Sequence, residues 1–306
     1  MSADDTLPRY GEAVTDSPTR ARHGGDRDRT RPPAPEPLPH PVVDNHCHLD
    51  IADGPDGAWF DAAEAIDAAA AVGVPRIVQI GCDLPGARWA VEAADRYEAL
   101  VAGVALHPNE APVLAARGQL DDAIAEIERL AQASPLVRAV GETGLDYFRT
   151  DEEGRPAQHE SFRRHIDLAK RLDKTLVIHD RDAHDDVVRI LDEEGAPDRW
   201  VMHCFSGDAA FARACLDRGA YLSFAGTVTF KNAQDVREAL VAAPVDRILV
   251  ETDAPYLTPT PHRGRPNASY LVPCTVRSMA DQRGADLEAL CAQIEASTFD
   301  AFGGIW

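Results

Sequence analysis

The chain has 306 residues, of which 44% are hydrophobic, so it can bury one large core and has the size of a single barrel domain. Its 51 acidic and 31 basic side chains give a formal net charge of -20, which excludes a broad surface that binds nucleic acid along its length. A small site that holds divalent cations can still supply positive charge to a single phosphate, so a short nucleic-acid footprint is compatible with this charge.

Residues 1–40 contain many Arg, Asp, Pro and Gly residues and almost no large apolar side chains, which predicts a disordered N-terminal tail. The pattern changes at Val42, and we expect the folded barrel domain to span residues 41–306. The N-terminus has no basic start followed by an apolar stretch, and no segment approaches the roughly 18 apolar residues of a membrane span. The six scattered cysteines contain no CxxC pair. We therefore expect a cytoplasmic protein with reduced thiols, no membrane partner and no stable protein partner.

From Val42 onward, short apolar runs alternate with longer segments in which apolar residues recur three and four positions apart. The apolar runs predict eight strands, at residues 42–44, 76–81, 100–106, 137–141, 175–178, 199–202, 220–225 and 247–250. The segments between them predict amphipathic helices, among them residues 58–72, 120–133, 158–172, 182–194, 208–218 and 232–241. Continuously apolar strands separated by helices are typical of a parallel sheet that is covered on both faces. Eight such units predict an α/β fold, a closed (β/α)8 TIM barrel.

An open doubly wound sheet would give a similar alternation, so the polar residues at the strand ends decide between the two folds. A barrel builds its site from residues that follow many strands, whereas a doubly wound sheet gathers its ligand at one switch point. Here histidines and acids follow the first, third, fourth, fifth, sixth and eighth strands, in the order His46 and His48, His107, Glu142, His179, His203 and Asp253. No GxGxxG loop follows the first strand and no GxxxxGK[ST] loop occurs, which also favours the barrel.

His46 and His48 are two positions apart, so an extended backbone points both imidazoles to one face and Cys47 to the other. Two nitrogens can therefore converge on one metal ion, whereas Cys47 is expected to pack in the core. Glu142 stands between glycines in the motif GETGLDY, where a carboxylate beside an apolar strand needs a compensating partner. An ion pair with an Arg would also compensate the charge, but the glycines allow other groups close to the backbone and favour metal ligation.

His179 and His203 each end an apolar run, and Asp253 ends the eighth. A single histidine in this position is commonly a core residue, but two in consecutive units, together with the first-strand pair, indicate metal ligands. Glu251 shares the facing of Asp253 but lies deeper in the barrel, so we rank it below Asp253 as a ligand.

Four imidazoles and two carboxylates suit borderline ions such as Zn²⁺ or Mn²⁺, although substrate and water oxygens can adapt a mixed site to Mg²⁺. Six ligands exceed the needs of one tetrahedral ion with an open position, so we expect two divalent metal ions, roughly 3.5–4 Å apart, with Glu142 able to bridge them. Such a pair lowers the pKa of a bound water, which predicts hydrolysis with Asp253 as the general base.

Four motifs together resemble the TatD-type metal-dependent deoxyribonucleases, a branch of the amidohydrolase-like barrels. They are DNHCHL at residues 44–49, GETGLDY at 141–147, HCFSG at 203–207 and ETDAPYL at 251–257. The resemblance implies that His46, His48 and Asp253 hold a first ion, that His179 and His203 hold a second, and that Glu142 bridges them. It also implies a 3′-exonuclease that takes DNA as its substrate, usually with Mg²⁺.

Three further features concern the substrate. His107 and the Arg263-Gly264 pair fit the family pattern, and His107 and Arg181 are candidate phosphate contacts, with a structural ion pair as the alternative for Arg181. The family commonly has Asn-x-Pro in the loop after the eighth strand, whereas this chain has Ser269 in place of the Pro. This difference bears on the shape of the loop and the substrate it admits, but on none of the six predicted ligands.

Two other functions compete with a nuclease. A hydrolase of a small ester, lactone or amide is the first, because related barrels catalyse these reactions with a similar ion arrangement. Many of those relatives have a carboxylated Lys after the fourth strand, and Glu142 at that place favours the nuclease. A non-catalytic barrel that serves as a binding platform is the second, and it has no need for six metal-binding groups in one place.

Overall fold

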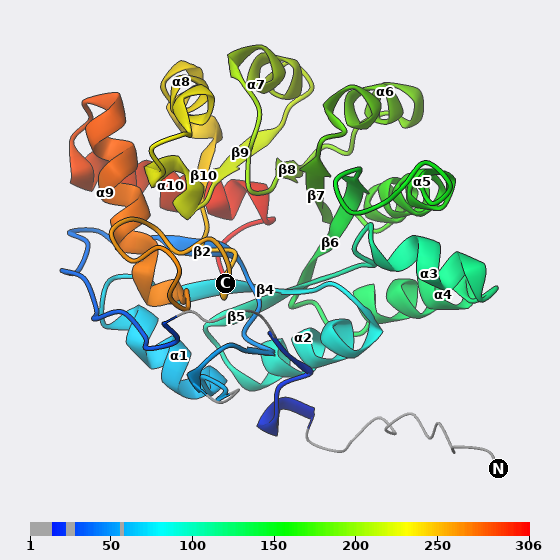
Figure 1. Cartoon of the computed structure of the whole chain (residues 1–306), viewed down its shortest axis with the longest axis horizontal. Coiled ribbons are helices and arrows are strands. Elements are labelled where there is room, and N and C mark those ends of the chain that lie inside the picture. The colour runs from blue at the N-terminus through cyan, green and yellow to red at the C-terminus, as the bar shows by residue number, and fades with distance from the viewer. Residues whose placement is uncertain (1–13, 23–27, 56–57) are drawn as a thin grey trace.

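Eight parallel strands form a nearly closed barrel in the computed structural model of the chain, which describes residues 14–22, 28–55 and 58–306 (Figure 1). Neighbouring strands are hydrogen-bonded in the order β10-β9-β8-β7-β6-β5-β4-β2. Their bounds are β2 (Val43–Cys47), β4 (Arg76–Gly81), β5 (Leu100–Val104), β6 (Val137–Asp146), β7 (Thr175–Arg181), β8 (Trp200–Met202), β9 (Tyr221–Phe224) and β10 (Ile248–Val250). The prediction of a barrel of eight parallel strands is confirmed.

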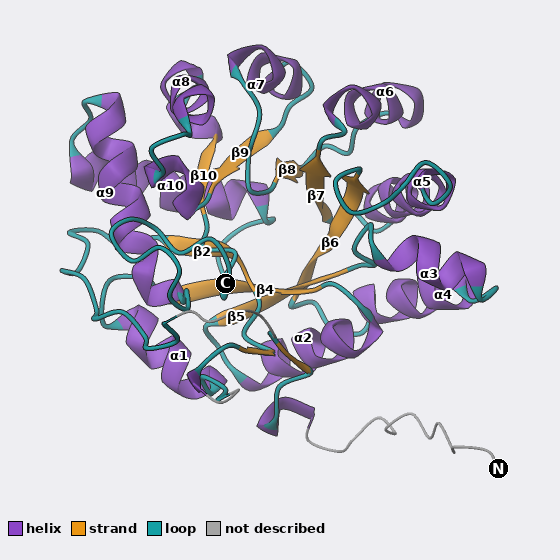
Figure 2. Cartoon of the chain, in the orientation of Figure 1, coloured by secondary structure: helices purple, strands orange, loops and turns teal. Residues whose placement is uncertain are grey.

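Helices surround the strands as an outer ring (Figure 2). They are α1 (Ala62–Ala70), α2 (Leu84–Arg96), α3 (Glu110–Ala116), α4 (Leu120–Ala131), α5 (Arg155–Arg171), α6 (His184–Glu194), α7 (Ala209–Leu216), α8 (Gln234–Ala242), α9 (Val272–Arg283) and α10 (Leu287–Ala301). Several begin at an aspartate whose side chain accepts a backbone N–H of the first turn: Asp61, Asp83, Asp208 and Asp286. None of the helices in the described part of the chain is both long and apolar enough to cross a membrane.

Side chains of successive strand residues divide between the inside of the barrel and the layer under the helices. On β4, Val78 and Ile80 belong to the inner cluster, whereas Ile77 packs in the outer one. Phe302, which follows α10, is also buried in the inner cluster. The inside of the barrel therefore contains a packed apolar core.

The barrel closes where the end of β2 meets the chain that follows β10. The N–H of Asp253 donates to the carbonyl of His46 at 2.9 Å, and the N–H of His48 donates to the carbonyl of Ala254 at 2.8 Å. Because these bonds join the end of β2 to the segment that follows β10, they bring predicted ligands that are more than 200 positions apart in sequence side by side.

Strand β6 is longer than the sequence predicts. It continues past residue 141 to Asp146, paired with β7 as far as Asp146 and Arg181, with a register shift between Gly141 and Thr143. Glu142 therefore lies within a strand rather than after one. The polar motif GETGLDY hid the extension, because its residues do not alternate in the way that a strand pattern requires.

Gly144 allows this extension. Its φ of 133° is a conformation that residues with a side chain rarely adopt, and an added Cβ would lie 2.1 Å from the carbonyl oxygen of His179. We expect Gly144→Ala to lower the free energy of unfolding by about 3 kcal/mol, because β6 and β7 must separate locally. Urea denaturation measures this loss.

Gly118 provides the matched control. It also has a positive φ, 66°, but an added Cβ would meet nothing within 4 Å, so Gly118→Ala should cost only about 1 kcal/mol. Equal losses in the two variants would show that the close approach of β6 and β7 does not matter.

Residues 14–22 and 28–40 pack against the barrel instead of extending as a tail. Residues 20–21 form β1 (Arg20–Ala21), which pairs in parallel with β3 (Ile51–Ala52). Leu38 is buried, and Arg265 and Tyr270 donate hydrogen bonds to backbone carbonyls of residues 30–32. The prediction of disorder is thus wrong for residues 14–22 and 28–40, because composition does not reveal hydrogen bonds that the barrel supplies. Residues 1–13 and 23–27, which belong to the same prediction, lie outside the described residues.

Candidate metal centre

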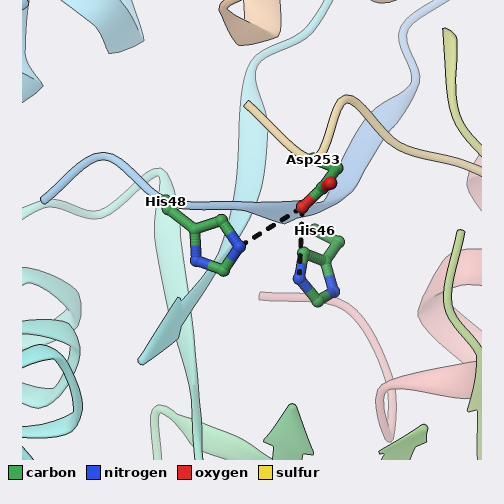
Figure 3. A group of neighbouring side chains, drawn as sticks. All are labelled: His46, His48 and Asp253. Atoms are coloured by element: carbon green, nitrogen blue, oxygen red, sulfur yellow. Dashed lines mark ion pairs between the residues drawn. The ribbon is translucent and has the colours of Figure 1, made fainter. Parts of the chain in front are cut away.

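Three predicted ligands meet where the barrel closes. His48 Nε2 lies 3.3 Å from Asp253 Oδ1, and His46 Nε2 lies 4.0 Å from the same oxygen (Figure 3). Both imidazoles are buried, whereas the side chain of Asp253 is 15% exposed. The two imidazoles and the carboxylate are close enough to hold one ion, and only the carboxylate faces solvent.

Backbone contacts orient this group. The carbonyl oxygen of Ile80 lies 2.9 Å from His48 Nδ1, so a proton on that nitrogen leaves Nε2 free to bind a metal. Asp253 adopts a left-handed backbone conformation with φ of 54°, which a non-glycine residue keeps only where its surroundings fix it. Its hydrogen bond to the His46 carbonyl is one such constraint.

Glu142 lies at the centre of the site, and its two oxygens face separate sets of imidazoles. Oε1 lies 2.6 Å from His179 Nδ1 and 3.3 Å from His203 Nε2. Oε2 lies 3.5 Å from His46 Nε2 and 4.0 Å from His48 Nε2. One carboxylate therefore touches both halves of the predicted ligand set, as a bridging ligand must.

The electrostatics of the centre follow from burial and from this crowding. Burial alone would raise the pKa of Glu142, but the imidazoles of His203, His107 and His179 hold it well below its ordinary value. Burial lowers the pKa of His46 to about 3, so this imidazole is neutral. Burial acts in the same direction on His179, but Asp146 and Glu142 outweigh it and raise its pKa to about 9. Metal binding here has to displace protons from some of the imidazoles.

Glu251 lies behind His203 and not among the ligands that face the opening. Its Oε1 is 2.9 Å from His203 Nδ1, and its Oε2 accepts a hydrogen bond from the Ser223 hydroxyl at 2.5 Å. Because Nδ1 is engaged by this fully buried carboxylate, His203 presents Nε2 to Glu142. A carboxylate behind a metal-binding histidine is a common way to fix its orientation.

His179 has a second acidic neighbour. Its Nε2 lies 3.4 Å from Asp146 Oδ2, and these two residues form a group with His107 that is compact enough to hold an ion. His203 belongs to a different group, with Glu142. The structure therefore brings all six predicted ligands to one end of the barrel, and His179 contacts two carboxylates there, Glu142 through Nδ1 at 2.6 Å and Asp146 through Nε2 at 3.4 Å.

The two candidate phosphate contacts lie in different surroundings. His107 Nε2 is 3.6 Å from Glu142 Oε1, so His107 lines the centre itself. Arg181 is exposed, and its guanidinium lies 3.8 Å from the ring centroid of Phe148, which is 61% exposed. The structural ion pair considered for Arg181 is not found among the described residues.

Cys82 was not anticipated as part of the site. Its thiol donates a hydrogen bond to Glu142 Oε2 at 3.3 Å, and burial raises its pKa well above the ordinary value, so the thiol stays protonated. Cys82 directly follows the second predicted strand, just as the predicted ligands follow theirs. This position could have identified it as a residue of the site.

Asp44 was also missed, although it lies in the first motif. It is fully buried, and it accepts hydrogen bonds from the N–H of Thr252 at 2.9 Å and from its hydroxyl at 2.6 Å. Burial raises its pKa to about 6. Asp44 fastens β2 to the segment that carries Asp253.

The loop after β10 is anchored despite Ser269. The side-chain amide of Asn267 donates to the carbonyls of Thr252 and Tyr256, at 2.9 and 2.6 Å. Ser269 is buried near Asp44 and begins the short helix η5 (Ser269–Leu271). Ser269 therefore faces the protein interior and not the opening of the site.

The residues present fit divalent metal ions. Among the described residues, neither ring nitrogen of the buried His46 has a hydrogen-bond partner, a costly state that a bound ion would relieve. The surrounding donors are imidazoles and carboxylates in the proportions that Zn²⁺, Mn²⁺ and related ions accept. A parallel barrel with such a cluster at its strand ends defines the class of metal-dependent hydrolases.

Comparison with known proteins agrees with this class. The sequence profile described as TatD related DNase matches residues 43–303. The chain therefore belongs to the TatD family of metal-dependent hydrolases. It is 45% identical over 269 residues to an uncharacterized metal-dependent hydrolase, TatD, of Mycobacterium tuberculosis, covering 87% of this chain and 99% of that protein. It is 32% identical over 253 residues to a protein of Klebsiella pneumoniae named 3′-5′ ssDNA/RNA exonuclease TatD, covering 79% and 92% of the two chains.

Solved structures support the fold. The crystal structure of YjjV, a TatD homologue from Escherichia coli, superimposes with a TM-score of 0.78 at 24% identity and covers 86% of this chain and 98% of its own. An organophosphorus hydrolase variant from Deinococcus radiodurans superimposes with a TM-score of 0.57 at 18% identity, covering 87% and 94%. At these identities the likeness concerns the barrel alone.

Proposed function

We propose that this protein is a deoxyribonuclease of the 3′-exonuclease type that hydrolyses phosphodiester bonds with two divalent ions, Mg²⁺, Mn²⁺ or Zn²⁺. The observation that carries the proposal is Glu142, because its two oxygens face two separate sets of imidazoles. A pair of ions held in this way suits displacement at a phosphodiester. The printed name of the Klebsiella pneumoniae relative, an exonuclease acting on ssDNA and RNA, supports the same substrate class.

In this proposal the chain's own residues position the ions and move one proton. When bound, the ions would neutralise charge on the phosphodiester and lower the pKa of the attacking water. His46, His48 and Asp253 would hold one ion and His179 and His203 the other, with Glu142 between them. Asp253 accepts the proton of the water, because it is the ligand carboxylate that faces the opening of the site, 15% exposed against 5% for Glu142. The net charge of -20 limits the DNA footprint to a short terminal stretch.

Digestion of end-labelled DNA tests this function. Single- and double-stranded oligonucleotides labelled at the 3′ or the 5′ end are incubated with Mg²⁺, Mn²⁺ or Zn²⁺, beside a panel of lactones, esters and dipeptides. We expect stepwise shortening from the 3′ end. Turnover of a small ester, lactone or amide without any cleavage of DNA would refute the nuclease function and favour the alternative, a hydrolase of small substrates.

Metal content is a separate prediction. We expect protein purified without chelator to contain about two ions per chain, and the His46→Ala/His48→Ala variant to contain about one, since the first ion loses two of its four protein ligands, the others being Asp253 and Glu142. Elemental analysis by mass spectrometry measures both values. His40→Ala is the control, because His40 pairs with Glu295 and does not line the site. Equal metal content in all three proteins would refute the ligand assignment.

A further inference from the structure

The N-terminal segment that precedes the family-matched region reaches the rim of the metal centre. The family profile begins at residue 43, so residues 14–22 lie outside it. Their backbone is bonded to the loop that directly follows the His-x-His strand: the N–H of Thr19 donates to Asp50 O at 2.9 Å, and the N–H of Arg22 donates to Ala52 O at 2.8 Å. These bonds flank the β1–β3 pairing and fix the position of Arg22.

The side chain of Arg22 points toward the chain that carries Asp253. It donates a hydrogen bond to the carbonyl of Pro255 at 3.0 Å, and its guanidinium lies 4.6 Å from the ring centroid of Tyr256. Tyr256 also lies beside His48, with ring centroids 6.2 Å apart. One aromatic ring therefore separates Arg22 from a proposed metal ligand.

Arg22 also lines a cavity of about 130 Å³ with the loop after β10. The other lining residues are Phe230, Leu257, Thr258, Arg263, Gly264 and Arg265. This volume is below the roughly 300 Å³ of a site for a drug-sized ligand but allows a small anionic group. The described lining contains three arginines and no carboxylate, which is unexpected in a chain with a net charge of -20.

The three arginines are not equivalent. The guanidinium of Arg265 is occupied, because it donates to the carbonyls of Thr30 and Arg31. Arg263 lies 3.9 Å from the ring centroid of Phe230 and has no ion pair among the described residues. The side chain of Arg22 is 30% exposed, and its guanidinium forms an ion pair with Asp53 Oδ2 at 3.3 Å. Arg22 and Arg263 are thus the cations with donors left for a ligand.

We propose that this cavity is a second phosphate-binding subsite, in which Arg22 and Arg263 bind a backbone phosphate of the substrate strand other than the one being cleaved. The inference rests on the proposed nuclease function. Arginine pairs bind phosphate oxygens through several charge-assisted hydrogen bonds, and such contacts position a strand without reading its bases. The N-terminal segment, through Arg22, would then add to strand binding an element that lies outside the family-matched barrel.

Binding of a fluorescent single-stranded oligonucleotide, measured by anisotropy in the presence of a chelator, tests the subsite without cleavage. We expect Arg22→Gln and Arg263→Gln each to weaken binding about tenfold, and each to reduce the slope of log K against log salt by about 0.7. Arg22→Lys keeps the charge and should retain more affinity than Arg22→Gln. Arg213→Gln, at an arginine on α7 whose side chain is 75% exposed, is the control and should bind as the unmodified protein does.

The outcomes separate the subsite from the nuclease. Arg263 makes no hydrogen bond or ion pair with segment 14–22 among the described residues, so a loss in Arg263→Gln does not come from release of the segment. Unchanged binding in both glutamine variants, or an equal loss in Arg213→Gln, would overturn the subsite even if DNA is cleaved. Weaker binding in the two variants together with no cleavage of DNA under any divalent ion would support the subsite and refute the nuclease. Absence of oligonucleotide binding by the unmodified protein would refute the subsite.

Discussion

Asp253→Asn is expected to lower kcat on single-stranded DNA by about a thousandfold, because the amide cannot accept the proton of the attacking water. The substitution keeps the size of the side chain, and the backbone hydrogen bond from Asp253 to His46 does not involve the carboxylate. The fold should therefore persist. Initial rates at saturating divalent ion measure the effect, so that weaker metal binding does not contribute.

Asp246→Asn is the matched control for this variant. Asp246 is exposed in the short helix η4 (Val245–Arg247), at the opposite end of β10 from Asp253. It should leave kcat unchanged. A loss of less than about tenfold in Asp253→Asn would assign the proton transfer to another group.

Glu142→Gln is expected to reduce kcat/KM by at least about a thousandfold and to lower the affinity for both ions. Four predicted ligand imidazoles lie within 4.0 Å of the Glu142 carboxylate, and the amide removes the negative charge that they share. Metal titration by calorimetry and rates on DNA measure the two effects together.

Glu251→Gln gives the informative comparison. Glu251 contacts the ligand imidazole of His203 and does not face the opening, so its loss should cost about 10- to 100-fold, which is the usual effect of a residue that orients a metal ligand. The exposed Glu288→Gln should have no effect. Equal losses of activity in Glu142→Gln and Glu251→Gln would contradict the proposal that Glu142 bridges the two ions.

The grouping of the proposed ligands could be expected from the sequence because each one follows a recognisable apolar run. Parallel strands present their C-terminal ends at one edge, so His46, Glu142, His179, His203 and Asp253 had to meet once the barrel was inferred. The residues that orient them were harder to predict. Glu251 was assigned a lower rank by depth alone, and its contact with His203 depends on the relative positions of β8 and β10, which no local pattern encodes.

The N-terminal region illustrates the same limit. Its composition resembles that of a disordered tail, yet residues 14–22 and 28–40 are held by hydrogen bonds to partners such as Asp50, Ala52, Arg265 and Tyr270. These partners are distant in sequence or belong to loops, so the periodicity of apolar residues does not indicate these contacts. This region brings Arg22 to the rim of the centre, and the proposed phosphate subsite rests on that contact.

Local sequence patterns specify the eight apolar strands, the helices between them and the residue types at the strand ends, because burial on both faces and strand–helix alternation recur along the chain. The folded chain alone shows how β6 extends past Glu142, how the end of β2 bonds to the segment after β10, and which carboxylate lies behind which imidazole. Those features arise from register, a glycine with φ of 133° and contacts between distant segments. The energies of these features depend on residues that are neighbours in space, and the spacing of residues along the chain does not reveal which residues those are.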